Sequence, residues 1–421
     1  MIRFPARLSA HSERTANIPV LDGLRGIAIL WVLAFHLSWL TAIQWHVSFG
    51  GQAFDLTYLL RTGFLGVELF FFISGFCIFY PYAQHAFGFR PYQTLGDFAF
   101  RRAIKIVPSY LLSLLFVAAL APVLFFPSQN LAWQLISHVL FIFNFSAATV
   151  SALNGVLWSL AIEVQFYLLF PLLCRAFQRS AIVTFTGLSA IAIVYRFWST
   201  ACCDSTSIVH YQLPAFLDFF ACGMLGAQIY CYGISRRFSE DVRSMRWWTV
   251  AAVASLIALT AFVRYVLWGF YLQNPNGVDR ADILFYLGVG FLVLTITTAF
   301  AGRTWQSLLS NKPLVFMSVI SYNLYLYHLI VSMSLLYRLH FPASKARIPQ
   351  TDPHWQISFL VIAAAVSITV ATIVTYAIER PLLRHGRQLL SQGMKRVARW
   401  MSGLAKSWPT GPSVPRGTQS A

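Results

Sequence analysis

Two ionisable residues, Arg25 and His36, are separated by ten positions in the apolar segment LDGLRGIAILWVLAFHLSWL. On a helix that rises about 1.5 Å per residue they lie about 16 Å apart along the axis, on nearly the same face. An arginine can bind an anion and a histidine can act as a base, so the pair predicts an anion anchor and a base along one path. The alternative is a structural pair, with the arginine extended to the membrane surface and the histidine bonded in the core. Asp22, three residues before Arg25, lies within ion-pair reach on the same helix.

Three further ionisable residues lie inside apolar segments, where charge is costly and marks candidate functional sites. Glu68 lies in GVELFFFISGF and is expected to pair with a cation or orient a histidine, unless it is a boundary carboxylate. Glu163 follows Trp158 in WSLAIEVQFYLLFPLL, where it can orient and charge an imidazole or bond another helix. His328 lies near Tyr325 in SYNLYLYHL and is either a second catalytic candidate or a hydrogen-bonded core histidine.

A basic cluster precedes the third long apolar segment, in FAFRRAIKIVPSY. Arg102 and Lys105 are three residues apart and face the same way on a helical turn, with Arg101 beside them. Arginine makes bidentate contacts with phosphate groups, so the cluster predicts a phosphate site. The alternative explanation is the excess of positive charge that cytoplasmic segments of membrane proteins carry.

The composition of the whole chain is that of a polytopic membrane protein. Of its 421 residues 57% are hydrophobic and only 11% are charged, against about 25% charged residues in soluble domains. Ten apolar segments approach the roughly 20 residues that a bilayer-spanning helix needs. We predict an all-α fold with transmembrane helices at 19–40, 63–80, 106–126, 157–176, 181–198, 213–232, 248–268, 281–301, 314–337 and 357–379.

Three local features refine this prediction. The segment 131–147 is apolar but shorter, so it is expected to lie in the interface or re-enter the membrane, with an eleventh span as the alternative. The small residues Ser74 and Gly75 predict a close helix contact in the second span. The six cysteines show no CxxC spacing, so we expect neither a disulfide framework nor a metal ion.

The net charge of +17 is mainly a signal of topology. With a cytoplasmic N-terminus, 24 of the 31 Lys and Arg residues fall on the inner side or in the tail, although the outer loop 338–356 carries three. This predicts a multi-pass protein of the inner (plasma) membrane, embedded in the lipid bilayer with both termini cytoplasmic, and no nucleic-acid partner. The expected domains are an N-terminal segment 1–18, a membrane domain 19–383 and a basic, partly disordered tail 384–421.

Six strings in order along residues 19–383 together resemble the acyltransferase-3 family of integral-membrane acyltransferases: LDGLRGIAILWVLAFH, GVELFFFISGF, RRAIKIVPSY, WSLAIEVQFYLLFPLL, SYNLYLYHL and AIERP. The resemblance implies a cytoplasmic acyl-CoA donor, expected to be acetyl-CoA, and a hydroxyl acceptor on an extracytoplasmic or lipid-linked carbohydrate. It maps the family's Arg/Lys-x10-His motif onto Arg25 and His36, and its membrane acid onto Glu163. The family's Arg-x-x-Arg pair maps onto Arg102 and Lys105, and the lysine departs from that pattern.

On this resemblance each candidate receives a role. His36 is expected to be the base or a transient acyl carrier, oriented by Glu163, with His328 as a weaker catalytic candidate. The CoA phosphates are expected at Arg25, Arg101, Arg102 and Lys105, and the remaining substrate-binding candidates are Glu68, Trp158 and Tyr325. Two alternatives stay open: a non-carbohydrate acceptor such as a macrolide or lipid, and a secondary transporter or flippase, which predicts paired helix breaks in two halves.

Overall fold

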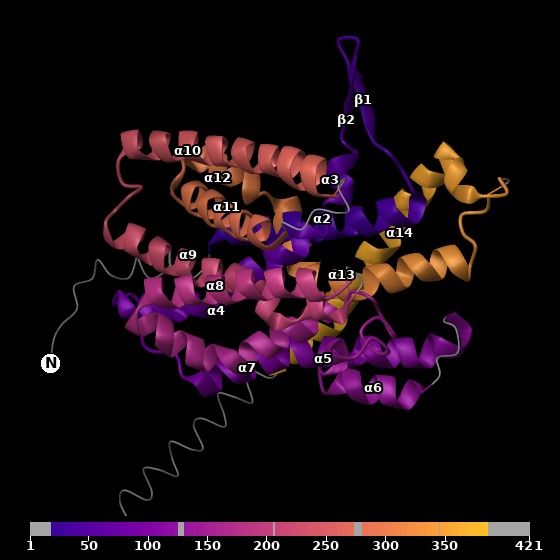
Figure 1. Ribbon diagram of the computed structural model, residues 1–421, viewed down its shortest axis with the longest axis horizontal. Helices are drawn as coiled ribbons and strands as arrows, with labels where there is room; N and C mark the ends of the chain where they lie inside the picture. Colours follow the sequence, from indigo (N-terminus) through magenta and orange to yellow (C-terminus); the bar gives the residue numbers. More distant parts are fainter. Residues whose placement is uncertain (1–17, 125–129, 205–206, 273–279, 345, 386–421) are drawn as a thin grey trace, which may run out of the picture.

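The computed structural model describes residues 18–124, 130–204, 207–272, 280–344 and 346–385 as a bundle of long helices with one small hairpin (Figure 1). The predicted segment 1–18 and the tail 384–421 therefore lie almost entirely outside the described residues. Within the described residues, ten helices are long and apolar enough to cross a membrane, so the predicted all-α polytopic fold is confirmed. Their main elements are α2 (Pro19–Thr41), α4 (Leu65–Ala86), α5 (Leu95–Leu124), α7 (Trp158–Arg179), α8 (Ala181–Cys202), α9 (Leu217–Ser235), α10 (Val242–Ala261), α11 (Arg280–Phe300), α13 (Lys312–Tyr337) and α14 (Pro353–Val374).

Shorter elements connect or extend these helices. They are β1 (His46–Phe49), β2 (Gln52–Asp55), α3 (Thr57–Arg61), α6 (Leu131–Val139), α12 (Arg303–Leu309), the 3-10 turns η1 (Phe143–Phe145), η2 (Ile208–Tyr211), η3 (Leu213–Phe216) and η5 (Pro349–Thr351), and the π-helical segments η4 (Phe262–Leu272) and η6 (Thr375–Glu379). The α6 helix has nine residues, or about 14 Å of rise, against a hydrocarbon core of about 30 Å. The eleventh-span alternative for 131–147 is therefore wrong.

The largest difference from the predicted spans concerns α5. It begins at Leu95 rather than at 106, because Arg and Lys are good helix formers and the basic cluster continues the helix instead of forming a loop. This extension places Arg101 and Arg102 on one turn, and Lys105 on the next, of the same helix that enters the membrane.

Helices α4 and α9 approach each other unusually closely through two glycines. A Cβ on Gly75 would lie 2.2 Å from the carbonyl oxygen of Phe220, and one on Gly223 would lie 2.0 Å from that of Phe72. Small residues allow such backbone contact between membrane helices, so the close contact predicted at Ser74 and Gly75 is confirmed.

Helix α13 packs between α2 and α14 (Figure 1). It begins after Asn311, whose side chain accepts the backbone N–H of Leu314 at 2.9 Å, with Pro313 in the first turn. Both features favour helix initiation at this point. Because α13 contacts α2 along much of its length, polar residues of the two helices can meet inside the bundle.

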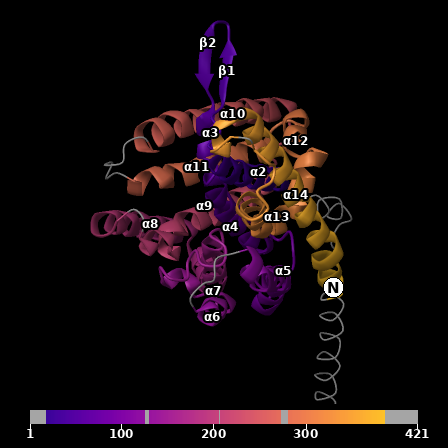
Figure 2. The same ribbon diagram turned by 90° about the vertical axis from the view of Figure 1, so that its right-hand side faces the viewer.

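The hairpin β1–β2 joins α2 to α3 and projects sideways from the bundle, across the direction of the long helices, in both views (Figures 1 and 2). Its antiparallel register pairs His46 with Asp55 and Val47 with Phe54. Gly50 and Gly51 form its turn with positive φ values of 59° and 79°, a conformation that glycine adopts without a steric penalty.

Candidate active site

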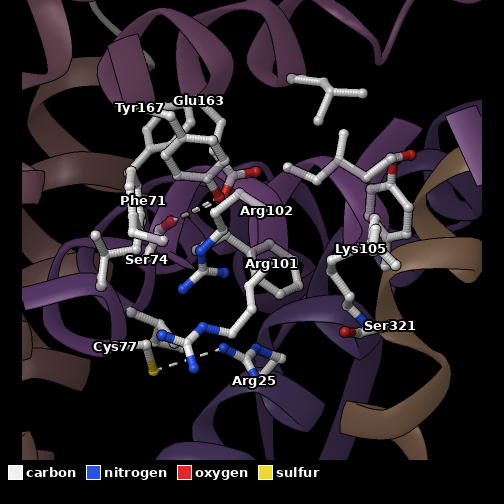
Figure 3. A pocket seen from close by; sticks show the side chains of 18 of the residues that line it. Arg25, Phe71, Ser74, Cys77, Arg101, Arg102, Lys105, Glu163, Tyr167 and Ser321 are labelled. Atoms are coloured by element: carbon white, nitrogen blue, oxygen red, sulfur yellow. Dashed lines mark hydrogen bonds between the residues drawn. The ribbon is translucent and has the colours of Figure 1, made fainter. Parts of the chain in front are cut away.

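A cavity of about 590 Å³ lies between helices α2, α4, α5, α7 and α13 (Figure 3). Six of the ten predicted site residues line it: Arg25, Arg101, Arg102, Lys105, Glu163 and Tyr325. Arg90, which the sequence analysis did not single out, lines it too. The cavity therefore collects cationic side chains from α2 and α5, which are far apart in the sequence, around one space.

The arginines of this cavity have weak or no acidic partners among the described residues. Arg25 contacts Asp22 at 3.9 Å, the ion pair expected from their spacing, and donates to the Cys77 Sγ at 3.7 Å. The Arg102 guanidinium lies over the Tyr167 ring, 5.5 Å from its centroid. Arg101 is exposed at the cavity edge and forms no salt bridge with a described residue. These guanidinium groups can therefore bind an anionic ligand and donate hydrogen bonds to it.

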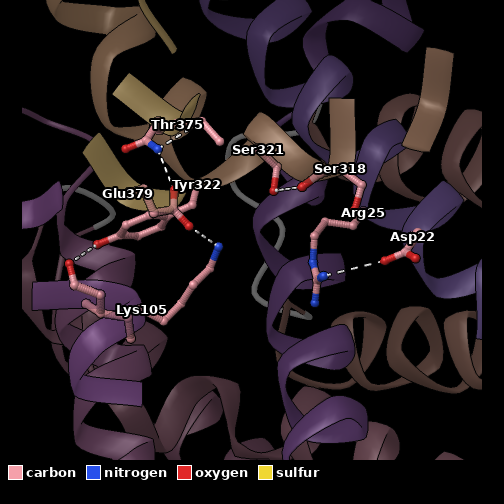
Figure 4. Close-up of polar contacts among 10 residues, drawn as sticks. Asp22, Arg25, Lys105, Ser318, Ser321, Tyr322, Thr375 and Glu379 are labelled. Carbon is pink, nitrogen blue, oxygen red and sulfur yellow. Dashed lines mark hydrogen bonds and ion pairs between the residues drawn. The ribbon is translucent and has the colours of Figure 1, made fainter. Parts of the chain in front are cut away.

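Lys105 is in a different electrostatic state, because Glu379 forms a salt bridge with it (Figure 4). The Glu379 side chain is only 3% exposed and also accepts the Asn323 Nδ2–H at 2.6 Å. The Lys105 charge is therefore already neutralised by an acid from the far end of the chain. Sequence analysis did not assign Glu379 to the site, and no pattern near Lys105 pointed to it.

Glu163 lies on the cavity wall, where two hydroxyl groups donate to the same carboxylate oxygen. Ser74 Oγ donates to Glu163 Oε1 at 2.6 Å, and the Tyr167 hydroxyl donates to it as well (Figure 3). Tyr167 is four residues from Glu163 on α7, so helix spacing could have predicted this contact, whereas Ser74 comes from α4. With Arg102 over the Tyr167 ring, the carboxylate is linked to the basic side of the cavity.

His36 and His328 meet at the interface of α2 and α13, outside the set of residues that line the cavity. His328 Nε2 lies 3.2 Å from His36 Nδ1, and His328 is fully buried. The predicted orientation of His36 by Glu163 is not what the structure shows. The imidazole that contacts His36 belongs to His328, and among the described residues the polar partners of Glu163 are Ser74 and Tyr167.

The partners of the two histidines fix which ring nitrogens carry protons. His328 Nδ1 lies 2.9 Å from the carbonyl oxygens of Leu324 and Tyr325, and His36 Nδ1 lies 2.9 Å from that of Val32. Carbonyl oxygens only accept, so both Nδ1 atoms are N–H donors in the neutral rings. His328 Nε2 then accepts from His36, and the unprotonated nitrogen of His36 is Nε2, which can take a proton from another group.

Tyr325 connects the cavity to the histidine pair. It lines the cavity and its ring centroid lies 5.9 Å from that of His328. Its hydroxyl donates to the Val156 carbonyl oxygen at 2.7 Å and lies 2.6 Å from Ser159 Oγ. On α13 the cavity is lined at Ser318, Ser321, Tyr322 and Tyr325. His328 is the next residue on that face.

Besides the two histidines, two more predicted site residues, Trp158 and Glu68, lie outside the cavity. Trp158 packs in an aromatic cluster, 4.9 Å from the Tyr211 ring centroid and 5.6 Å from that of Phe216. Glu68 is buried near the ion pair of Arg196 with Asp218, and its Oε2 has no hydrogen-bond partner among the described residues. Both are packing neighbours of the site. Among the described residues neither forms a hydrogen bond with its polar groups, although Glu68 lies within electrostatic range of Tyr325.

Comparison with known proteins defines the family. Residues 18–376 match the model of the acyltransferase-3 family, described as an acyltransferase domain, and the chain therefore belongs to this family. The chain is 27% identical over 337 residues to the O-acetyltransferase OatA of Staphylococcus aureus strain NCTC 8325, covering 74% of this chain and 50% of that protein. OatA of strain COL matches with the same values. This chain thus spans about half the length of the curated relatives it matches, and no solved structure matches it.

Proposed function

We propose that this protein transfers an acyl group, expected to be acetyl, from cytoplasmic acyl-CoA to a hydroxyl of an extracytoplasmic or lipid-linked carbohydrate. The observation that carries the proposal is the single cavity that joins the cationic residues of α2 and α5 to Tyr325, the neighbour of the histidine pair. Membership of the acyltransferase-3 family and the O-acetyltransferase relatives support the reaction class.

The cationic side of the cavity suits the phosphate groups of CoA. Arg25, Arg101 and Arg102 have charges that no close carboxylate cancels among the described residues, since the contact of Arg25 with Asp22 is long, at 3.9 Å. We assign the phosphates to these three arginines, and to Lys105 only after it leaves Glu379. The pantetheine arm would extend along the cavity toward Tyr325.

His36 acts as the general base in the proposed reaction. Its Nε2 removes the proton of the acceptor hydroxyl while the hydroxyl oxygen attacks the thioester carbonyl carbon. The tetrahedral intermediate then collapses, the C–S bond breaks, and the proton on His36 passes to the departing CoA thiolate. His328 Nε2 and the Val32 carbonyl oxygen accept from His36 Nδ1–H throughout, which stabilises the imidazolium between the two steps.

The positively charged inner segments of the sequence support a plasma-membrane protein with both termini in the cytoplasm. The basic cavity residues lie near the starts of α2 and α5, whereas His36 and His328 lie toward the other ends of α2 and α13. In this orientation the donor enters from the cytoplasm and the acceptor hydroxyl meets His36 near the opposite surface.

The experiment that tests the proposal follows thiol release from acetyl-CoA by the purified full-length protein, together with acetyl transfer to surface-polysaccharide fragments. His36→Ala is expected to lower transfer by about 10²–10⁴-fold while binding of a non-hydrolysable CoA analogue stays unchanged, and the exposed His354→Ala serves as the matched control. Full transfer activity in His36→Ala, or no turnover of acetyl-CoA by the unaltered protein with any hydroxyl acceptor, would contradict the proposal.

A further inference from the structure

A second cavity, of about 280 Å³, lies between α2, α3, α10, α11 and α12 and shares no lining residue with the first. None of the described residues that line it is charged, and most are large apolar side chains, among them Leu24, Trp31, Leu259, Phe291 and Leu309. A water molecule needs about two to four polar partners to occupy a buried site. The wall offers few polar atoms, so the cavity favours a hydrocarbon occupant over water.

The shape of this cavity suits a chain. Its wall runs along α2 from Leu24 to Trp31, about 10 Å of helix rise. A cavity of about 150 Å³ holds one benzene molecule, so 280 Å³ has room for on the order of ten carbon atoms. A sugar has hydroxyl groups that this wall cannot pair with, which leaves an alkyl chain as the occupant.

The end of the cavity nearest the hairpin carries positive charge. Tyr58, Leu59 and Val263 line this end. The Arg264 guanidinium carbon lies 5.3 Å from the Tyr58 ring centroid, and Arg61 follows two residues after Leu59. With a cytoplasmic N-terminus, both arginines fall on the outer side, Arg61 between the predicted spans 19–40 and 63–80 and Arg264 near the end of the span 248–268.

Neither arginine forms a salt bridge with an acid of the described residues, and Asp55 is the acid whose interaction with Arg264 is established. It lies within electrostatic range of Arg264, but its carboxylate is held by the backbone N–H of Thr57 at 2.9 Å and lies 3.7 Å from His46. Among the described side chains, Arg61 and Arg264 against Asp55 leave a positive charge beside an apolar cavity. An anionic head group attached to an alkyl chain matches both features.

The hairpin places this end of the cavity at the lipid interface. It projects sideways from the bundle rather than along the helix axes (Figures 1 and 2). Its cross-strand pair Val47 and Phe54 is 38% and 47% exposed, and the preceding Trp45 is 45% exposed. Exposed aromatic side chains are typical of the boundary between hydrocarbon and head groups.

We propose that this cavity binds one acyl chain of an anionic phospholipid from the leaflet at the hairpin end of the bundle, with the head-group phosphate at Arg264 and Arg61. The site is independent of the proposed acyl transfer, because it shares no residue with the first cavity. A bound lipid would brace α10 against α2, since the chain fills the space between them.

The test uses purified full-length protein in nanodiscs and a phosphatidylglycerol with a photoactivatable group on one acyl chain. We expect mass spectrometry to find cross-links on Trp31, Leu259 or Val263, and excess phosphatidylglycerol to compete better than phosphatidylcholine. Leu259→Trp, which fills the cavity, should lower this labelling at least about fivefold, whereas Ile257→Trp on the exposed face of α10 should not. Labelling spread evenly over α10, or unaltered by Leu259→Trp, would overturn the site.

The head-group contact is tested by substituting a residue that does not itself line the cavity. Phosphatidylglycerol is expected to raise the thermal unfolding midpoint more than phosphatidylcholine does, because a ligand that binds the folded state stabilises it. Arg264→Gln should abolish that difference, and Arg347→Gln, an exposed arginine of the loop 338–356, should retain it. An unchanged lipid preference in Arg264→Gln, or stronger competition by a polyprenyl phosphate than by phosphatidylglycerol, would refute the assignment to an anionic phospholipid.

Discussion

Replacing His328 tests the tautomer assignment on which the proposed chemistry depends. His328 is fully buried and its Nε2 accepts from His36 Nδ1–H at 3.2 Å. His328→Leu removes this acceptor, and His328→Gln keeps a side-chain oxygen that can accept. We expect the leucine variant to lose most of its activity and the glutamine variant to recover part of it.

The size of the loss follows from the charge that His36 gains during the reaction. A hydrogen bond that involves a charged group contributes about 1.5–3 kcal/mol. In the wild-type protein this stabilisation acts once His36 has become an imidazolium. A variant without it should therefore have a kcat lower by roughly 10–150-fold. The KM for acyl-CoA should change little, because His328 does not line the cavity that we assign to the donor.

The assay is steady-state acetyl transfer by the purified variants, with thermal unfolding measured on each to detect loss of fold. If His328 acts through His36, the double variant His36→Ala/His328→Leu should be no slower than His36→Ala alone. Losses that multiply in the double variant, or wild-type kcat in a folded His328→Leu protein, would refute the coupling of the two rings.

Three further predictions concern other contacts. Arg102→Gln should raise the KM for acyl-CoA by about tenfold or more, whereas Lys105→Gln should have a smaller effect because Glu379 already neutralises Lys105; equal effects would contradict the assignment. Glu379→Gln should lower that KM, since it frees the half-buried Lys105 charge beside the cavity, and isothermal titration with a CoA analogue checks this. Gly75→Ala should destabilise the protein by about 1–3 kcal/mol, because its Cβ would lie 2.2 Å from the Phe220 carbonyl oxygen. Gly187→Ala, whose Cβ would meet nothing within 4 Å, is the control, and thermal unfolding in detergent measures both.

The positions of the membrane helices could be predicted because they depend on local composition. A bilayer requires long apolar segments whatever their partners, so hydropathy locates them without knowledge of the packing. Hydropathy does not locate the start of α5. The turns that carry Arg101 and Lys105 are helical because of their helix propensity, but they are not part of the apolar segment. The hairpin was not predicted, because its strands have only four residues each.

The membership of the site could be predicted more completely than its internal contacts. Rare charges within apolar segments are costly, so residues such as Arg25 and Glu163 stood out individually. Their partners depend on which helix faces meet, and the pairing of His36 with His328 joins residues 292 positions apart. Glu163 was assigned to His36 by analogy with catalytic triads, but the hydroxyl of Ser74 on α4 reaches its carboxylate instead.

The position of Tyr325 explains how the proposed reaction could avoid an open channel through the membrane. Tyr325 is the last residue of α13 that lines the cavity. The histidine pair lies on the other side of Tyr325. The Tyr325 hydroxyl is held by the Val156 carbonyl oxygen and by Ser159. Each such bond contributes about 0.5–1.5 kcal/mol, so turning the ring aside costs little compared with an acyl-transfer barrier. A donor bound at the arginines could therefore displace Tyr325 and reach His36 without a permanent opening between the two ends of the bundle.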